Sequence, residues 1–503
     1  MNVETFLRHH QIRESPFRAE EARQDAVFTR IETICHHPDY AKIRGEFDRP
    51  SSAIVFGERG SGKTAMRLQI EHELREHNRN HPEKRCLLIA YDDLNPVLDR
   101  FHLQMGEATA AASIERFRLV DHLDGMLSTI VPRLMDQLLN ESRDEPVIEA
   151  EPSLRKVWRQ SDAATKRDVL LLQSCYDRPE EADLRTSRVR RALRTGTLSL
   201  MPWMKWAAVG LGGLTIALAL LVLIRNPEEQ RWLWLAALVV FAVLSLFTGG
   251  QYLRRSWQMH SIARTLAKSL RTLHRPAMSF RKSLCTLPVH DVLTSELPND
   301  TGDDARYHMV QRLLHALRPL GYRSMIVIVD RIDEPTLVNG EPERMRAIIW
   351  PLMNNKFLQQ DQIGIKLLLP LDLKHELFRE RTDFFREARL DKQNLVERLT
   401  WSGAMLYDIC TTRLNACREE GVEPMSLREL FDETVTHGDL VDALDQMQQP
   451  RDAFKLMYAV IQEHCSSLPE ETPQWQIPKL TLDTVRKQQV ERLGGMLRGV
   501  RPA

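Results

Sequence analysis

The sequence predicts an α/β fold, in which a parallel-sheet core holds a phosphate-binding loop and is interrupted by two membrane-length helices. Three features of the 503 residues carry this prediction. A glycine-rich loop at 57–64 stands between an apolar strand and a helix, and an apolar strand at 325–329 ends in an aspartate. Two uncharged apolar runs, 206–224 and 232–248, lie between that loop and that aspartate. The chain from 403 onward has a helical pattern, and we expect it to form a lid.

The composition is that of a folded protein of a reducing compartment. Lys+Arg and Asp+Glu are equal at 69 each, so no overall charge attracts nucleic acid. The seven cysteines are scattered and never spaced CxxC, which favours free thiols over a zinc site or a disulfide framework. The opening stretch, MNVETFLRHHQIRESPF, has no apolar core long enough for a secretory signal. We therefore expect the bulk of the chain in the cytoplasm and no nucleic-acid partner.

An eight-residue loop matches a pattern that binds nucleotide phosphates. Residues 57–64 read GERGSGKT, which is GxxxxGK[ST] without a mismatch, and they follow the strand SSAIVF and open a helix. Glycines let the backbone N–H groups converge on phosphate oxygens, and the helix N-terminus adds its positive dipole end. We expect Lys63 to reach the β- and γ-phosphates of ATP and Thr64 to give an oxygen to Mg²⁺. The predicted nucleotide-binding residues of the loop are Gly57, Glu58, Arg59, Gly60, Ser61, Gly62, Lys63 and Thr64.

The two apolar runs have the length that a helix needs to cross a membrane. About 20 residues at 1.5 Å per residue span the ~30 Å hydrocarbon core. Only the polar turn RNPEEQR separates the runs, which predicts a helical hairpin. Arginines precede the first run, and a basic block without any acid, 251–290, follows the second. Since positive charge marks the cytoplasmic side, we expect a multi-pass protein of the cytoplasmic (inner) membrane, with both termini in the cytoplasm and anionic lipids of the inner leaflet as partners.

A second acidic strand completes the predicted site. In SMIVIVDRIDEP the apolar residues 325–329 end in Asp330, with Asp333 and Glu334 just beyond. A buried strand with an aspartate at its C-terminal tip is how this class of fold holds its metal ion, so Asp330 joins Thr64 as a predicted Mg²⁺ ligand. Asp333 or Glu334 could orient the attacking water as general base, and the two stay open as alternatives.

The arrangement of these features resembles that of known P-loop NTPases. The pattern hhhhDxhDE at 326–334 is similar to the Walker B strand of the STAND-type NTPases, which include the NACHT ATPases. Transmembrane helices inserted between the Walker A loop and the Walker B strand are typical of the KAP family, which this chain resembles over most of its length. The resemblance implies an ASCE, AAA+-like core with Asp330 at the metal and Asp333 and Glu334 as the downstream acids. Arg331 replaces the small or acidic residue usual there.

Three arginines are further candidates for contact with the nucleotide. The helix after the core strand 364–373 carries Arg386 and Arg389. In AAA+ and STAND-like proteins an arginine there can point at a neighbour's γ-phosphate, which implies a homo-oligomer, although ion pairs at helical spacing explain these residues equally well. Arg451 opens a long helix of the lid-like region, where such proteins can sense nucleotide. An ordinary helix N-terminal residue is the alternative.

The predicted organisation has seven segments. An N-terminal segment, 1–50, is a helical strut or packs beside the adenine. The NTPase core is divided into 51–125 and 306–402, with the Walker B and sensor strands in the second part. The other segments are a helical cytoplasmic insert at 126–204, the membrane hairpin at 205–250, a basic cytoplasmic insert at 251–305 and the helical lid at 403–503.

The expected function is that of a membrane-anchored ATPase, which hydrolyses ATP with Mg²⁺ to drive a conformational or assembly change at the cytoplasmic membrane face. Two alternatives stay open. One is a STAND-like signalling switch of the stress- or phage-defence type with slow turnover, and the other is a membrane scaffold that binds nucleotide without hydrolysing it. A transporter is disfavoured, because two helices without an internal charge offer no substrate path. The sequence identifies no protein partner.

Overall fold

The computed structural model describes most of the chain, in two compact units. The first unit comprises Met1–Arg75, Ile328–Ile332 and Gly364–Ala503, and the second comprises Glu76–Val327 and Asp333–Ile363. The residues outside the description are 19–21, 23–24, 32–35, 142–145, 150–152, 181, 196–199, 226–230, 379–393, 470–472 and 498–503.

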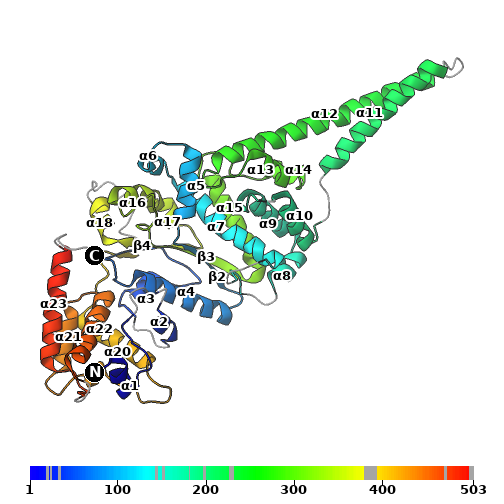
Figure 1. Cartoon of the computed structure of the whole chain (residues 1–503). Coiled ribbons are helices and arrows are strands. Elements are labelled where there is room, and N and C mark those ends of the chain that lie inside the picture. The colour runs from blue at the N-terminus through cyan, green and yellow to red at the C-terminus, as the bar shows by residue number, and fades with distance from the viewer. Residues whose placement is uncertain are drawn as a thin grey trace. The chain divides into compact units, whose positions relative to one another are not determined.

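A five-stranded parallel sheet gives the chain its α/β character, as the sequence predicts (Figure 1). The strands lie in the order β2-β3-β4-β1-β5. Val55 of β1 pairs with Leu368 on one side and Val396 on the other, both in parallel register. β1 is buried along its whole length, which fits the continuous apolar runs of parallel strands covered on both faces. The strands are β1 (Ala53–Gly57), β2 (Arg85–Tyr91), β3 (Tyr322–Val329), β4 (Ile363–Pro370) and β5 (Asn394–Val396).

In the first unit, the N-terminal segment and the C-terminal helices form one helical body. Phe6, Ile12 and Phe17 belong to the same apolar core as the buried residues of α20, α21 and α22. The backbone N–H of Arg13 donates to the carbonyl of Cys417 at 2.8 Å, which fixes the register between the two ends of the chain. The helices that lie in this unit or begin in it are α1 (Val3–His9), α2 (Ala26–Arg30), α3 (Tyr40–Arg44), α4 (Lys63–Asn80), α18 (Leu371–Phe378), α20 (Gly403–Ala416), η4 (Leu427–Leu430), α21 (His437–Asp445), α22 (Pro450–Ser467) and α23 (Lys479–Leu497).

The second unit is mainly helical around a bundle that includes α7, α9, α13 and α15 (Figure 1). Charged groups are buried inside it in pairs, as burial requires. Arg306 donates to Asp124 at 3.3 Å with both side chains fully buried, and the Tyr176 hydroxyl donates to Asp124 at 2.8 Å. The helices are α5 (Asn95–Met105), α6 (Ala110–Ile114), α7 (Leu119–Leu139), α8 (Leu154–Gln160), α9 (Ala163–Tyr176), α10 (Ala182–Leu193), α11 (Leu200–Arg225), α12 (Arg231–Ser269), α13 (Ala277–Leu284), α14 (Val289–Thr294), α15 (Asp304–Leu317), η1 (Arg318–Leu320), α16 (Pro342–Ile349), η2 (Trp350–Met353) and α17 (Asn355–Leu358).

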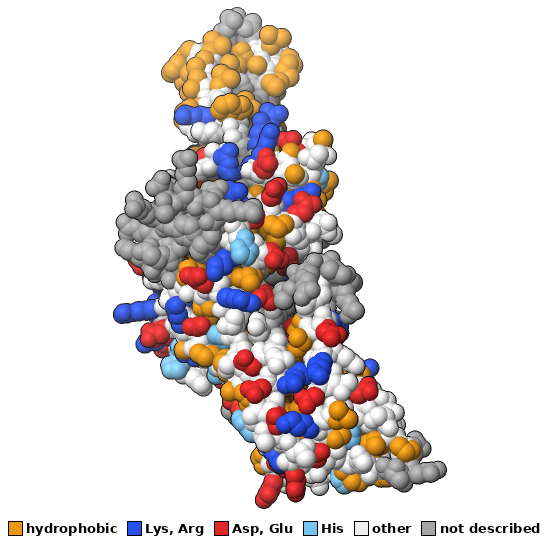
Figure 2. Space-filling model, turned by 90° about the vertical axis from the view of Figure 1, so that its left-hand side faces the viewer, with side chains coloured by type: hydrophobic (Ala, Val, Ile, Leu, Met, Phe, Trp, Pro, Cys, Tyr) orange, Lys and Arg blue, Asp and Glu red, His pale blue; other side chains and the backbone are white. Residues whose placement is uncertain are grey.

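Helices α11 and α12 are long and apolar enough, by length and composition, to cross a membrane. The most apolar 18-residue stretches of the spans Trp203–Ile224 and Trp232–Ser269 have mean hydropathies of 2.5 and 2.2, and neither stretch is buried inside the protein. The two helices approach closely, and the Ser245 hydroxyl donates to the carbonyl of Ala208 at 3.3 Å. Figure 2 shows apolar side chains gathered on this hairpin, with Lys and Arg side chains at its base. This finding agrees with the two predicted apolar runs.

The second of these helices extends well beyond the predicted run. α12 is 39 residues long, or about 58 Å at 1.5 Å per residue, whereas the hydrocarbon core is about 30 Å thick. Its last turn is fixed by polar contacts within the second unit. Arg271, just after the helix, bonds to Asp121 of α7 at 2.6 Å, and Arg306 of α15 donates to the carbonyl of Ser269 at 3.2 Å.

The acid-free basic block is divided between the surface and the interior. Arg254, Arg264, Lys268 and Lys282 are exposed. Arg275 is instead only 4% exposed and donates to the carbonyl of Ser174 at 2.7 Å. Part of the block therefore stabilises the helical bundle, which the charge pattern alone does not reveal.

Candidate functional site

The predicted phosphate loop connects β1 to α4 within the first unit, and its shape depends on its glycines. Gly60 and Gly62 have φ angles of +94° and +92°, which L side chains rarely adopt. A Cβ atom at Gly57 would collide with the Ser61 hydroxyl. The Ser61 N–H donates to the carbonyl of Glu58 at 3.2 Å and closes the turn. Arg59 is exposed at the outer side of the loop.

The two side chains predicted to act on phosphate and metal lie at the first turn of α4. The Lys63 ammonium donates to the carbonyls of Gly57 and Glu58, at 2.7 and 2.8 Å, so it curls back over the loop. The Thr64 hydroxyl donates to Oδ2 of Asp330 at 3.0 Å. The structure thus brings together the two predicted Mg²⁺ ligands, which are 266 residues apart in the sequence.

Asp330 follows β3 directly and is held from two directions. It is 1% exposed, and its Oδ1 accepts the backbone N–H of Arg331 at 3.0 Å. Arg331 has a φ of +58°, so the chain turns sharply after the aspartate. On the other side, Nε of Arg67 lies 3.9 Å from Oδ2, the same oxygen that accepts the Thr64 hydroxyl.

Residues from later in the chain cover the phosphate loop. Arg398 bonds to Oε1 of Glu58 at 2.6 Å, and the amide of Gln449 donates to Oε2 of the same carboxylate. The indole N–H of Trp401 donates to the carbonyl of Ser61 at 2.8 Å. The loop's outer edge is therefore held by the segment after β5 and by the residue before α22.

The other predicted site residues have different outcomes. Arg451, in the first turn of α22, donates its backbone N–H to the carbonyl of Gly60 at 3.4 Å. A Cβ at Gly60 would lie 2.8 Å from that of Arg451, so the arginine lies directly on the loop. Asp333 and Glu334 belong to the second unit, where the Asp333 carbonyl accepts the Gly340 N–H at 3.0 Å. The predicted arginines Arg386 and Arg389 lie outside the described residues.

Burial affects one carboxylate beside these contacts. It raises the pKa of Asp452, which follows Arg451 in α22, and the negative charge of Glu58 adds to the increase, while the nearby cations oppose it.

Four contacts in this site were not predicted from the sequence. Arg398 and Gln449 are 340 and 391 residues from Glu58, and no local pattern marks either of them. Arg67 carries a weak signal, because a charged residue three positions after Thr64 shares its face of the helix. Trp401 has no signal beyond its apolar character.

The residues of the loop are suited to a magnesium nucleotide. Positive-φ glycines at a helix N-terminus direct backbone N–H groups towards an anion. Mg²⁺ is usually held by one or two protein oxygens together with phosphate oxygens and water, so one carboxylate and one hydroxyl are sufficient. Among the described residues no group of three or more His, Cys, Asp or Glu could hold a metal by itself. The pair Thr64 and Asp330 accordingly fits a metal shared with phosphates rather than a site built wholly from protein.

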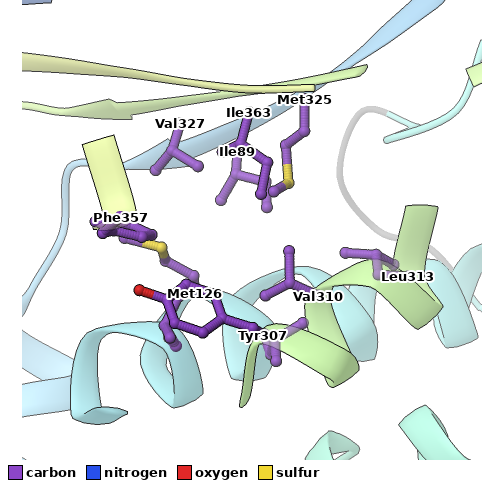
Figure 3. A pocket seen from close by; sticks show the side chains of 11 residues that line it. Ile89, Met126, Tyr307, Val310, Leu313, Met325, Val327, Phe357 and Ile363 are labelled. Atoms are coloured by element: carbon purple, nitrogen blue, oxygen red, sulfur yellow. The ribbon is translucent and has the colours of Figure 1, made fainter. Parts of the chain in front are cut away.

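A pocket in the second unit has a different character (Figure 3). It lies between β2 and β3 on one side and α7 and α15 on the other, and its volume is about 10 Å³. That is about the space of one water molecule, and an apolar cavity of this size stays dry. It is a small packing gap in the core, with no group to recognise a phosphate. Its lining residues are Ile89, Leu123, Met126, Leu127, Tyr307, Val310, Leu313, Met325, Val327, Phe357 and Ile363.

Comparison with known proteins gives no match: no family model, no curated protein and no solved structure is significantly similar to the chain.

Proposed function

We propose that the chain is a membrane-anchored ATPase whose phosphate loop, residues 57–64, binds ATP with Mg²⁺ in the first unit. The observation that carries the proposal is the hydrogen bond of 3.0 Å between Thr64 and Asp330, at the end of a loop with two positive-φ glycines. A hydroxyl at a helix N-terminus beside a strand-end carboxylate is the pair that holds Mg²⁺ against the β- and γ-phosphates in P-loop NTPases. The bound metal would neutralise the charge that develops on the transferred phosphoryl group.

The residues of this chain have separate roles in the proposal. Lys63 exchanges its two backbone carbonyls for phosphate oxygens, since an ammonium gains more from an anion than from a neutral acceptor. Asp333 or Glu334 orients the attacking water as general base. Arg386 or Arg389 would act on the γ-phosphate of a neighbouring copy in a homo-oligomer.

The membrane part of the proposal depends on α11 and α12. Their two apolar spans and the exposed basic residues that follow support a hairpin inserted in the cytoplasmic membrane with both termini inside, against anionic lipid headgroups. The proposed cycle changes the conformation of the cytoplasmic part at the membrane face, and its protein partner is a matter for experiment.

The experiment is phosphate release by the full chain in detergent, over a range of protein concentrations. Lys63→Ala and Asp330→Asn should lose release, while Asp333→Asn and Glu334→Gln should identify the base, because one of them should bind ATP without turnover. Release per protein that rises with concentration supports the oligomer. Equal release from wild type and Lys63→Ala would contradict the proposed activity.

A second candidate function is a nucleotide-dependent switch with slow turnover. The contacts of Arg398 and Gln449 with Glu58, and of Arg451 with Gly60, favour it, because they connect the segment after β5 and the start of α22 to the phosphate loop. Tight binding of ATP or ADP, with hydrolysis slower than dissociation of the bound nucleotide, would support the switch. Tight binding without any turnover would leave the membrane scaffold.

A further inference from the structure

Beside the proposed metal ligand lies a buried cation that the phosphate-loop pattern does not include. Arg67 is in α4, one helical turn after Thr64, and its side chain is 5% exposed. Its Nε lies 3.9 Å from Oδ2 of Asp330 and 3.5 Å from Oε1 of Glu71. The Asp330 and Glu71 side chains are 2% and 14% exposed. One arginine thus lies between two carboxylates, of which one is the proposed Mg²⁺ ligand.

We propose that Arg67 is a positioning residue that sets the Mg²⁺ requirement of the phosphate site, by sharing its charge between Asp330 and Glu71. This inference rests on the function proposed above. It adds a residue that no phosphate-loop pattern contains, and it assigns that residue a role in metal affinity rather than in folding alone.

Arg67 acts on the metal site through its charge. A guanidinium stays charged under all ordinary conditions, and charges in a buried site interact more strongly than they do in water. The oxygen that faces Arg67 is Oδ2, which also accepts the Thr64 hydroxyl. A cation held between Thr64 and Asp330 is therefore repelled by Arg67 and competes with it for the same carboxylate oxygen. Removing the arginine should make Mg²⁺ bind more tightly.

Glu71 provides the opposite influence. It lies four residues after Arg67, the spacing at which side chains meet on one face of a helix. Its negative charge offsets part of the arginine's charge, and its carboxylate remains a partner for the guanidinium when Asp330 binds the metal. Removing the Glu71 charge should leave Arg67 more firmly on Asp330, so that Mg²⁺ binds more weakly. The two substitutions therefore act in opposite directions.

The test measures binding of a fluorescent ATP analogue to the full chain in detergent while Mg²⁺ is titrated. Arg67→Met should lower the half-saturating Mg²⁺ concentration about three- to tenfold, and Glu71→Gln should raise it about threefold. Arg67→Lys, which keeps the charge, should stay near wild type. A merely structural role predicts lower stability in each variant and the same half-saturating Mg²⁺ concentration.

The possible outcomes separate the two proposals. Wild-type chain that binds no nucleotide with Mg²⁺ overturns the proposed function, and this inference with it. The role of Arg67 alone is overturned if wild type binds nucleotide with Mg²⁺ but the two variants do not respond in opposite directions. That is the case if the half-saturating Mg²⁺ concentration is unchanged in both Arg67→Met and Glu71→Gln, or shifts in the same direction in both. If Arg67→Met elutes as aggregate in size-exclusion chromatography, the result with Glu71→Gln is decisive. A higher half-saturating Mg²⁺ concentration in this variant supports the inference, and an unchanged or lower one contradicts it.

Discussion

Gly60 combines two constraints at the scale of a single residue. Its φ of +94° disfavours any side chain, and a Cβ atom there would lie 2.8 Å from the Cβ of Arg451. We expect Gly60→Ala to lower ATP affinity by about tenfold, or about 1.4 kcal/mol, because the loop must deform where its N–H groups meet the phosphates. Equilibrium binding of a fluorescent ATP analogue measures the change.

Gly421→Ala is the matched control for this prediction. Gly421 lies in the same unit with a φ of +82°, but nothing is within 4 Å of the position that its Cβ would take. Its substitution should cost about 1 kcal/mol of stability through backbone strain and leave ATP affinity unchanged. Equal affinity losses in both variants would show that general strain, not the loop's shape, is responsible.

At the scale of elements, α7 contains a buried histidine that makes stability depend on pH. Burial lowers the pKa of His122 from 6.5 to about 4, against a partial increase from its bond of 2.7 Å to the carbonyl of Ile348. Between pH 4 and pH 6.5 this imidazole is protonated in the unfolded chain but neutral in the folded chain. Its contribution to the free energy of unfolding is therefore fully present above pH 6.5, and about 3 kcal/mol is lost as the pH falls towards 4.

His122→Gln should remove this loss while an amide N–H keeps the bond to Ile348. Burial raises the pKa of Asp124 to about 7, which makes stability fall as the pH rises through the same range. This effect is present in both proteins, so the difference between them isolates the histidine. Unfolding midpoints in one detergent from pH 4.5 to 7.5 should show the variant gaining on wild type as the pH falls. A difference that does not vary with pH would contradict the role assigned to His122.

A charge in the middle of the first apolar span should weaken membrane insertion of the hairpin. Leu214 lies near the middle of the Trp203–Ile224 span and is 45% exposed. An arginine at the centre of a membrane helix costs about 2.5–3.5 kcal/mol of insertion free energy, so Leu214→Arg should reduce the chain that stays in the membrane after an alkaline wash. Leu103→Arg, at a leucine of α5 that is 72% exposed, should change nothing. Equal retention of both variants would argue against a membrane-inserted hairpin.

At the scale of the whole molecule, contacts between distant parts of the sequence hold the phosphate loop. Removing Arg398 and Gln449 together frees the Glu58 carboxylate, and fluorescent ADP should then dissociate about two- to fivefold faster, the range expected for a half-exposed ion pair. Stopped-flow displacement measures the rate. Arg8→Ala removes an exposed pair with Glu4 in the same unit and should leave the rate unchanged. An unchanged rate in the double variant would mean that these contacts do not retain nucleotide.

Features determined by residues close together in the sequence could be predicted, whereas features determined by contacts between distant residues could not. The loop glycines, the strand that ends in Asp330 and the two apolar helices are local patterns, and the structure contains the parallel sheet and the long helices that they predict. The continuation of α12 to Ser269 was not predicted, because its later residues are polar and resemble an ordinary surface helix. Burial of Arg275 and the contacts of Glu58 depend on tertiary packing, which no local spacing records.

Whether the loop at 57–64 binds a magnesium nucleotide is measured by equilibrium binding. Fluorescent ATP is titrated with the detergent-solubilised full chain, with Mg²⁺ and with EDTA, beside Lys63→Ala and Thr64→Ala. We expect wild type to bind fluorescent ATP saturably, with displacement by unlabelled ATP and tighter binding in Mg²⁺ than in EDTA. Thr64→Ala should bind ATP with the same affinity in Mg²⁺ and in EDTA. Lys63→Ala should not bind ATP. Binding of the same strength in all three proteins, or none in folded wild type, would contradict the binding of a magnesium nucleotide at this loop.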